Sequence, residues 1–130
     1  MEDKKLMVDS TILIDYFRKT DKANSKLVSH FRNYEHLYIS SVTEFEVVNG
    51  ATEKHLKFLD GMLARVTILD FDSNAARQAA KIVAQLKTKR KTIDKPDLFI
   101  AATAVVNNLT LDTLNIKHFT HIENLNLLTR

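Results

Sequence analysis

Three acidic residues that are distant in the sequence occupy positions where their carboxylates could form one site. Asp9 directly follows a short apolar run, Glu44 follows a second one, and Asp97 opens a long apolar stretch. Because burying an unpaired charge costs several kcal/mol, Asp97 should face water, a basic side chain, helix N-terminal amides or a metal ion. The chain has no cysteine. A set of carboxylate ligands alone favours Mg²⁺ or Mn²⁺ over zinc.

Each acid also has a simpler interpretation. Asp97 follows Pro96, the only proline, and could be a first-turn acid that interacts with the helix dipole. Asp9 could be a helix N-cap, although Ser10 could serve that purpose. Glu44, like the nearby Glu46, could be a solvated helix residue. The three acids are therefore more informative together than singly.

The elements that must position these acids alternate between strand and helix. Apolar and β-branched runs predict strands at Lys5–Val8, Leu37–Ile39, Val66–Leu69 and Leu109–Leu111, and a fifth at Leu125–Leu128. Helical spacing and capping residues predict helices at Thr11–Arg18, Lys22–Asn33, Ser41–Asn49, Thr52–Leu63, Asn74–Lys87 and Asp97–Asn107. We expect Gly50 to end its helix in the left-handed conformation.

This alternation predicts an α/β fold with a parallel sheet covered on both faces. The carboxyl ends of parallel strands meet at one edge of the sheet, and ligands bind there. Asp9, Glu44 and Asp97 should all lie at that edge. Like charges repel at short range, so a cation between the acids would stabilise the cluster.

Composition restricts the function only broadly. The 130 residues predict a single domain spanning 1–130, and the absence of cysteine excludes a disulfide scaffold and a thiol nucleophile. No apolar run reaches the roughly 18 residues that span a bilayer, so we expect a cytoplasmic protein without a membrane partner. The net charge of +3 is compatible with nucleic acid. The densest basic run, Lys87, Lys89, Arg90 and Lys91, is either a solvated helix end or a set of phosphate contacts.

Four segments, taken in order, resemble the motifs of PIN-domain proteins, and most closely those of VapC-type toxins. They are Val8–Asp15, the helix entry Ser41–Glu44, Asp97–Ala104 and Leu109–Phe119. The likeness covers essentially the whole chain. It implies a PIN-like three-layer α/β/α sandwich around a short central parallel sheet of four to five strands.

The resemblance also implies a metal site. Asp9, Glu44 and Asp97 would be the catalytic, metal-coordinating acids, with Ser10, Thr113 and Asn115 as supporting residues. A fourth acid usually stands where this chain has Asn115 or His118, and an aspartate appears instead at Asp112, where the family usually has an apolar strand residue. The carbonyl of Asn115 could still hold a water at the metal.

The implied activity is that of an endoribonuclease. Mg²⁺ or Mn²⁺ would activate a water for in-line attack on an RNA phosphodiester, leaving 5′-phosphate and 3′-hydroxyl ends. The substrate would be RNA, with tRNA as one candidate by analogy. The implied partners are a small cognate antitoxin, bound at an apolar groove near Tyr16, Phe17 and Phe31, and a second copy of the chain in a homodimer.

Two other functions are compatible with the sequence. A haloacid-dehalogenase-like phosphatase also begins with an aspartate after its first strand, but it needs a second one where this chain has Thr11. A PIN domain without its fourth acid could instead be a catalytically degenerate scaffold that binds RNA or protein. Metal binding distinguishes the scaffold from the enzyme.

Overall fold

The sheet at the centre of the molecule is fully parallel. The structure, a computed structural model, describes residues 4–129. Four strands pair in the order β3-β2-β1-β4. Their bounds are β1 Lys5–Val8, β2 His36–Ser40, β3 Thr67–Leu69 and β4 Leu111–Asp112. The parallel sheet predicted from the strand–helix alternation is confirmed.

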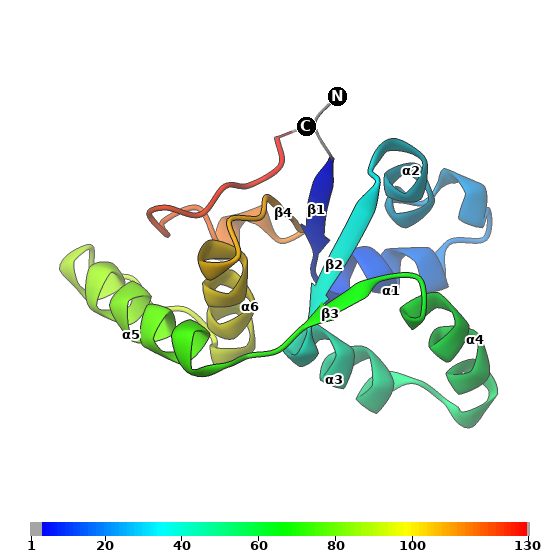
Figure 1. Ribbon diagram of the computed structural model, residues 1–130, viewed down its shortest axis with the longest axis horizontal. Helices are drawn as coiled ribbons and strands as arrows, with labels where there is room; N and C mark the ends of the chain where they lie inside the picture. Colours follow the sequence, from blue (N-terminus) through cyan, green and yellow to red (C-terminus); the bar gives the residue numbers. More distant parts are fainter. Residues whose placement is uncertain (1–3, 130) are drawn as a thin grey trace.

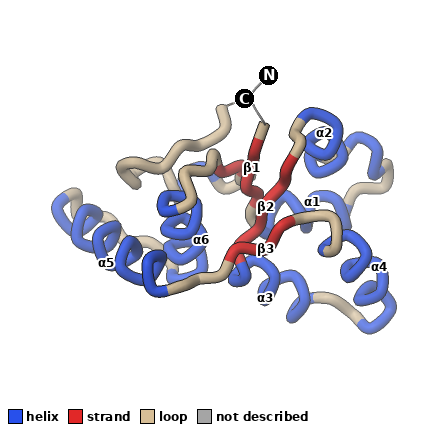
Figure 2. Tube along the Cα trace, in the orientation of Figure 1, coloured by secondary structure: helices blue, strands red, loops and turns tan. Residues whose placement is uncertain are grey.

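Helices cover both faces of this sheet, as Figure 1 shows, with α5 and α6 on one side and α1, α2 and α4 on the other. Figure 2 marks the same division, with the strands in red between the two groups of helices. The helices are α1 Ser10–Arg18, α2 Lys26–Asn33, α3 Ser41–Gly50, α4 Glu53–Leu63, α5 Ser73–Thr88 and α6 Lys95–Val106, with short 3₁₀ turns η1 Lys22–Asn24 and η2 Ile116–His118. The result is the predicted three-layer α/β/α sandwich.

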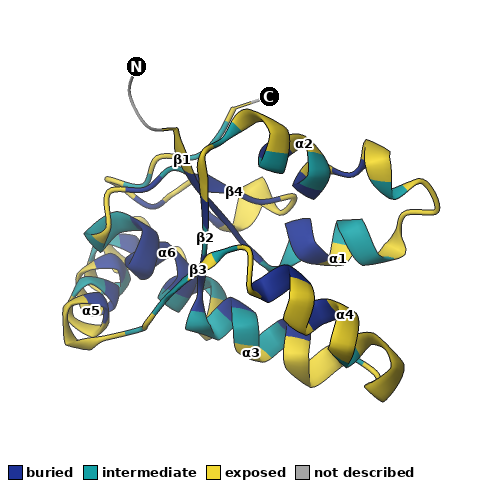
Figure 3. Ribbon diagram, turned by 45° about the vertical axis from the view of Figure 1, so that its right-hand side comes forward, coloured by how far each residue is buried: buried dark blue, intermediate teal, exposed yellow. Residues whose placement is uncertain are grey.

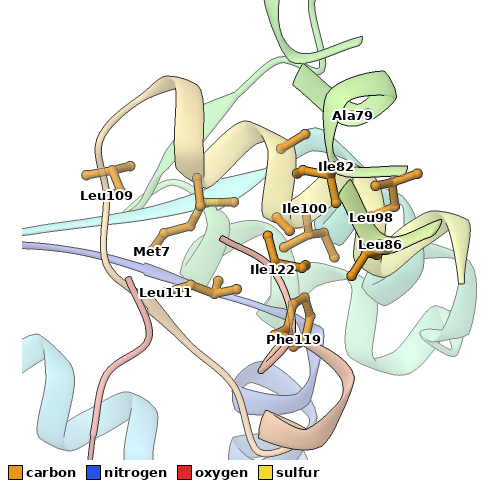
Figure 4. Close-up of a cluster of buried hydrophobic side chains, with 13 residues drawn as sticks. Met7, Ala79, Ile82, Leu86, Leu98, Ile100, Leu109, Leu111, Phe119 and Ile122 are labelled. Atoms are coloured by element: carbon orange, nitrogen blue, oxygen red, sulfur yellow. The ribbon is translucent and has the colours of Figure 1, made fainter. Parts of the chain in front are cut away.

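Side chains that alternate between the two faces of β1 contribute to two separate hydrophobic clusters. Met7 points into a cluster formed mainly by α5 and α6, whereas its neighbours Leu6 and Val8 point into a cluster formed with α1, α2 and α4. Successive side chains of a strand face opposite sides of the sheet, so one strand can fill both layers. Figure 4 shows the first cluster, in which Met7 and Leu111 meet Ile100 and Phe119. Both faces of the sheet are therefore buried, while α4 and α5 keep exposed outer surfaces (Figure 3).

Local capping explains where several helices begin. Asp9 caps α1, Ser25 caps α2, and Asp72 caps α5 through a 2.9 Å hydrogen bond from the Ala75 amide. The cap at Ser25 is the reason that the predicted helix Lys22–Asn33 is broken into η1 and α2. Pro96 lies in the first turn of α6, where a backbone N–H would have no acceptor within the helix, so its missing N–H costs no helical hydrogen bond.

Three of the predicted details are wrong. Gly50 belongs to α3 and has no positive φ, because the chain leaves this helix through an extended Ala51. Left-handed residues end α5 and α6 instead, at Arg90 and Asn108. The fifth strand is reduced to one bridge between Leu111 and Leu127 within the described part of the chain. The fourth strand begins two residues later than predicted, which places Asp112 inside it.

Candidate metal-dependent active site

Asp9 lies at the carboxyl end of β1 and is buried, with 2% of its surface exposed. As the N-cap of α1 it accepts a 3.0 Å hydrogen bond from the Thr11 amide and a second bond from the Thr11 hydroxyl. Burial raises the pKa of Asp9, and hydrogen bonds from Thr11 and Thr113 partly oppose that rise. The helix-cap and site interpretations of Asp9 are thus compatible, because the cap fixes the carboxylate at the edge of the sheet.

Thr11 and Thr113 join α1 to the loop after β4. The Thr11 hydroxyl accepts a 2.9 Å hydrogen bond from the Leu114 amide and lies 3.5 Å from the Thr113 hydroxyl. Thr113 in turn accepts a 3.0 Å bond from the Asn115 amide. The sequence predicted a supporting role for Thr113 but none for Thr11. The one signal was its position two residues after an acidic N-cap, where a hydroxyl can reach back to the cap.

The acid of α3 that meets the cluster is Glu46. Ser10 donates a 3.1 Å hydrogen bond from its hydroxyl to Glu46 Oε1. Burial raises the pKa of Glu46, and the negative charges of Asp97 and Asp9 raise it further. Glu46 therefore lies close enough to Asp9 and to Asp97, on two other elements, for their negative charges to act on its carboxylate.

Sequence reasoning chose Glu44 rather than Glu46. The two residues flank the buried stripe of α3, which contains Thr43 and Val47, on opposite sides. At about 100° per residue, they point about 200° apart around the helix. Glu46 interacts with Ser10, Asp9 and Asp97. The flank of α3 that faces this cluster is therefore the flank of Glu46, and Glu44 lies on the opposite one. Ser10, predicted to support the site, does contact it.

Asp97 lies in the first turn of α6 at the same edge of the sheet, and its partner is a histidine. His118 Nδ1 lies 2.9 Å from Asp97 Oδ2, and the side chains are 51% and 23% exposed. His118 belongs to η2, and Asn115 is the N-cap of this turn. The sequence identified position 118 as a place where an acid is usual, but it did not predict that the histidine there would bind Asp97.

The donors match a hard divalent cation in kind but are not gathered around one point. Asp9 and Asp97 raise the pKa of Glu46, so a cation among the three would offset their charge, and oxygen donors of this type suit Mg²⁺ or Mn²⁺. Across residues 4–129, no group of three or more His, Cys, Asp or Glu side chains stands ready to hold an ion. The residues therefore fit such a cation by chemistry, and binding would require their side chains to close around it.

Asp112, the unusual acid of β4, is directed away from this cluster to His30. Its carboxylate is fully buried and forms a hydrogen-bonded ion pair with His30 Nε2 from α2. It therefore does not serve as the missing fourth acid. Its backbone contributes there, through a 3.2 Å bond from the Asp9 amide to the Asp112 carbonyl.

The basic run lies at the carboxyl end of α5. Its four cationic residues are exposed, and Lys89 pairs with Glu123 at 3.4 Å and approaches the His121 carbonyl at 3.4 Å. Left-handed Arg90 turns the chain at this point. The placement agrees with a solvated helix end, and contact of Lys87, Lys89, Arg90 and Lys91 with RNA stays a prediction.

An apolar groove opens between α1, α2 and α4. It has a volume of about 450 Å³ and includes Tyr16, Phe31 and Phe58 in its lining. Tyr16 and Phe58 stack with ring centroids 5.9 Å apart, and Arg65 lies over Phe31. A second hollow, of about 310 Å³, is lined by Phe17 and by Glu46. The aromatic residues predicted to form a binding groove therefore do line grooves, although α4 contributes a wall that the sequence did not predict.

Comparison with known proteins identifies the family. The PIN domain family model matches residues 6–124. The chain is 34% identical over 130 residues to Ribonuclease VapC1 of Methanocaldococcus jannaschii, covering 97% of this chain and 87% of that protein. It is 30% identical to the tRNA(fMet)-specific endonuclease VapC of Shigella flexneri, covering 91% and 92%. The DNA-bound VapBC structure from Salmonella typhimurium superposes with a TM-score of 0.85 at 26% identity, covering 98% of both chains.

The fold and these relatives define a PIN-domain protein, and the chain belongs to that family. Within the family it belongs to the VapC group. The resemblance identified from sequence motifs is thereby confirmed. Among residues 4–129, no helix is both long enough and apolar enough to cross a membrane.

Proposed function

We propose that this protein is a metal-dependent endoribonuclease and the toxin of a toxin–antitoxin pair. The observation that carries the proposal is that Asp9, Glu46 and Asp97 lie at the carboxyl edge of the sheet, where Ser10, the neighbour of Asp9, donates a hydrogen bond to Glu46 and both aspartates raise the pKa of Glu46. The names of the M. jannaschii and S. flexneri relatives support the nuclease, and the VapBC structure supports a second protein as partner.

In this proposal Asp9, Glu46 and Asp97 hold Mg²⁺ or Mn²⁺. When bound, the ion supplies positive charge to the scissile phosphate and lowers the pKa of a water molecule. Asp9 is held ready by the Thr11 amide and by two threonine hydroxyls, so its carboxylate needs little reorganisation. Ser10 fixes one oxygen of Glu46. These bonds orient the acids toward one edge, where an RNA backbone can approach from solvent.

Substituting the two glutamates separately tests which acid of α3 belongs to the site. We expect Glu46→Gln to reduce RNA cleavage at least about a hundredfold, the scale of loss when a group that stabilises developing charge is removed. Glu44→Gln, on the opposite flank of α3, should keep activity close to wild type. Cleavage of a labelled RNA in Mn²⁺ and Mg²⁺ measures both variants. Full activity of Glu46→Gln together with loss in Glu44→Gln would overturn the assignment.

Asp97→Asn tests the metal dependence itself. The folded variant should show no measurable metal-dependent cleavage, and EDTA should abolish wild-type activity. If wild-type protein binds RNA but neither cuts it nor binds Mn²⁺, the degenerate scaffold is the correct function. Cleavage that survives both EDTA and Asp97→Asn would exclude the metal mechanism.

The RNA path is proposed to include Lys87, Lys89, Arg90 and Lys91, whose charges can neutralise phosphates. Lys89 is already paired with Glu123, so Lys87, Arg90 and Lys91 should matter more. We expect their joint change to Ala to weaken RNA binding irrespective of sequence and to flatten its dependence on salt. tRNA is the first substrate to test, because the S. flexneri relative is a tRNA(fMet)-specific endonuclease. A homodimer is part of the same proposal and can be measured by light scattering.

A further inference from the structure

His118 directly contacts the proposed metal site but is not one of its three proposed metal-binding acids. Its Nδ1 lies 2.9 Å from Asp97 Oδ2. Within the part of the chain that the structure describes, this is the only hydrogen bond made by the Asp97 side chain, so the other carboxylate oxygen has no protein donor. The imidazole therefore engages one oxygen and leaves one available.

The backbone that carries His118 is fixed on both sides. Before it, the Asn115 amide donates to the Thr113 hydroxyl, and the His118 amide donates to the Asn115 carbonyl at 3.0 Å. After it, Phe119 is 1% exposed and packs in the core beside Ile122 and Leu111 (Figure 4). A side chain on such a turn is held in place even though its imidazole is half exposed.

We propose that His118 is a positioning residue of the metal site. It donates its Nδ1–H to Asp97 Oδ2 and so orients this acid with the second oxygen directed to the cation. The proposal rests on the metal-dependent function proposed above. It gives the histidine at this position a task that an acid could not perform, because a carboxylate at neutral pH cannot donate a hydrogen bond to Asp97.

The expected effects on folding and on metal affinity distinguish a positioning role of His118 from a purely structural one. An exposed ion pair or hydrogen bond contributes little to folding, so its loss should leave the protein folded. A hydrogen bond to a metal-binding side chain, in contrast, typically changes metal affinity about 10–100-fold. Metal affinity is therefore the informative measurement, and it does not depend on activity.

Three substitutions at His118 test the donor. His118→Ala removes it. His118→Asn places an amide N–H the same number of bonds from the backbone as Nδ1, whereas His118→Gln places it one bond further out. Mn²⁺ binding to the full chain, measured by titration calorimetry with thermal unfolding as a folding check, should weaken about tenfold or more in the Ala and Gln variants. The Asn variant should remain within about threefold of wild type.

His121 supplies the matched control. It is an exposed histidine of the neighbouring loop that contacts Gln85 and Lys89 through its backbone carbonyl. His121→Asn should leave Mn²⁺ affinity unchanged. Wild-type affinity in His118→Ala, or an Asn variant as weak as the Ala variant, would overturn the positioning role while leaving the metal site intact. Failure of the wild-type chain itself to bind Mn²⁺ would overturn the proposed function, and the positioning role with it.

Discussion

The buried carboxylate of Asp9 at the proposed site lowers the stability of the folded protein when it is ionised. Burial raises the pKa of Asp9, so keeping this acid ionised at neutral pH opposes folding. The native state holds the proton more tightly than the unfolded chain does. This penalty is therefore fully present above the raised pKa, decreases as pH falls through it, and vanishes below the unfolded value near 3.8.

Asp9→Asn should therefore unfold at a higher temperature than wild type at pH 7.5 in EDTA. Asparagine remains a good N-cap and can still accept the Thr11 amide bond. The difference should shrink as the pH is lowered through the raised pKa of Asp9 toward 3.8, and saturating Mn²⁺ should reduce it by stabilising wild type alone. Thermal unfolding followed by circular dichroism measures both trends. A variant less stable than wild type at pH 7.5 would contradict the argument.

Thr43 is a second residue whose side chain lowers the stability of the folded protein. Its hydroxyl is the one buried side-chain polar atom in residues 4–129 that lacks a hydrogen-bond partner. Thr43→Val replaces it with an apolar group of similar shape, so the free energy of unfolding should rise by about 1 kcal/mol. Thr103→Val is the matched control, because Thr103 is equally buried but donates a 2.8 Å bond to the Phe99 carbonyl. Urea unfolding should show no gain for the control.

At the scale of elements, a buried ion pair joins α2 to β4. His30 and Asp112 are 82 residues apart and almost completely buried, and Asp112 immediately precedes Thr113 of the site. A pair of this kind is weak evidence of net stabilisation, but removing one partner leaves the other in a poor environment. The strand and the helix that borders the apolar groove are thus joined by a buried side-chain interaction.

His30→Leu and Asp112→Val should each destabilise the fold by about 3–5 kcal/mol, and the double variant should recover most of that loss. Urea unfolding of the four proteins in a double-mutant cycle gives the coupling energy. Single variants within about 0.5 kcal/mol of wild type would show that surrounding groups or water satisfy either partner alone.

At the scale of the whole molecule, the apolar groove is the surface where the proposed antitoxin would bind. The groove between α1, α2 and α4 is lined by aromatic side chains, and Phe58 remains 51% exposed beside it. An amphipathic helix of a partner would bury this surface. A partner that also occupied the second hollow would touch Glu46 directly and could block the site.

Phe58→Ser should weaken binding of the antitoxin at least about tenfold, because buried aromatic anchors dominate interfaces of this kind. The same variant should keep its nuclease activity, because Phe58 does not contact the acid cluster. Phe45→Ser is the control: Phe45 is 65% exposed and lies outside both hollows. Equal loss of antitoxin affinity in the two variants, measured by calorimetry, would exclude the groove.

Much of this molecule follows from local patterns. The alternation of strands and helices predicted a parallel α/β/α sandwich, because apolar periodicity is a property of short segments. Asp9 and Asp97 were identified for the same reason: one follows a strand and caps a helix, and the other follows Pro96 in a first helical turn. Gly50 was misjudged because the path of the chain beyond α3, rather than the glycine, sets how that helix ends.

The tertiary structure alone decided the remaining members of the site. Glu44 and Glu46 flank the same buried stripe, so the helical pattern treats them alike, and only the packing of α3 against α1 brings Glu46 to Ser10. His118 reaches Asp97 across 21 residues because buried Phe119 anchors η2 beside α6. Sequence thus determined which edge of the sheet carries the chemistry, since strand ends are local. Which side chains meet there depends on how helices rotate and loops anchor, and those are set by packing over the whole chain.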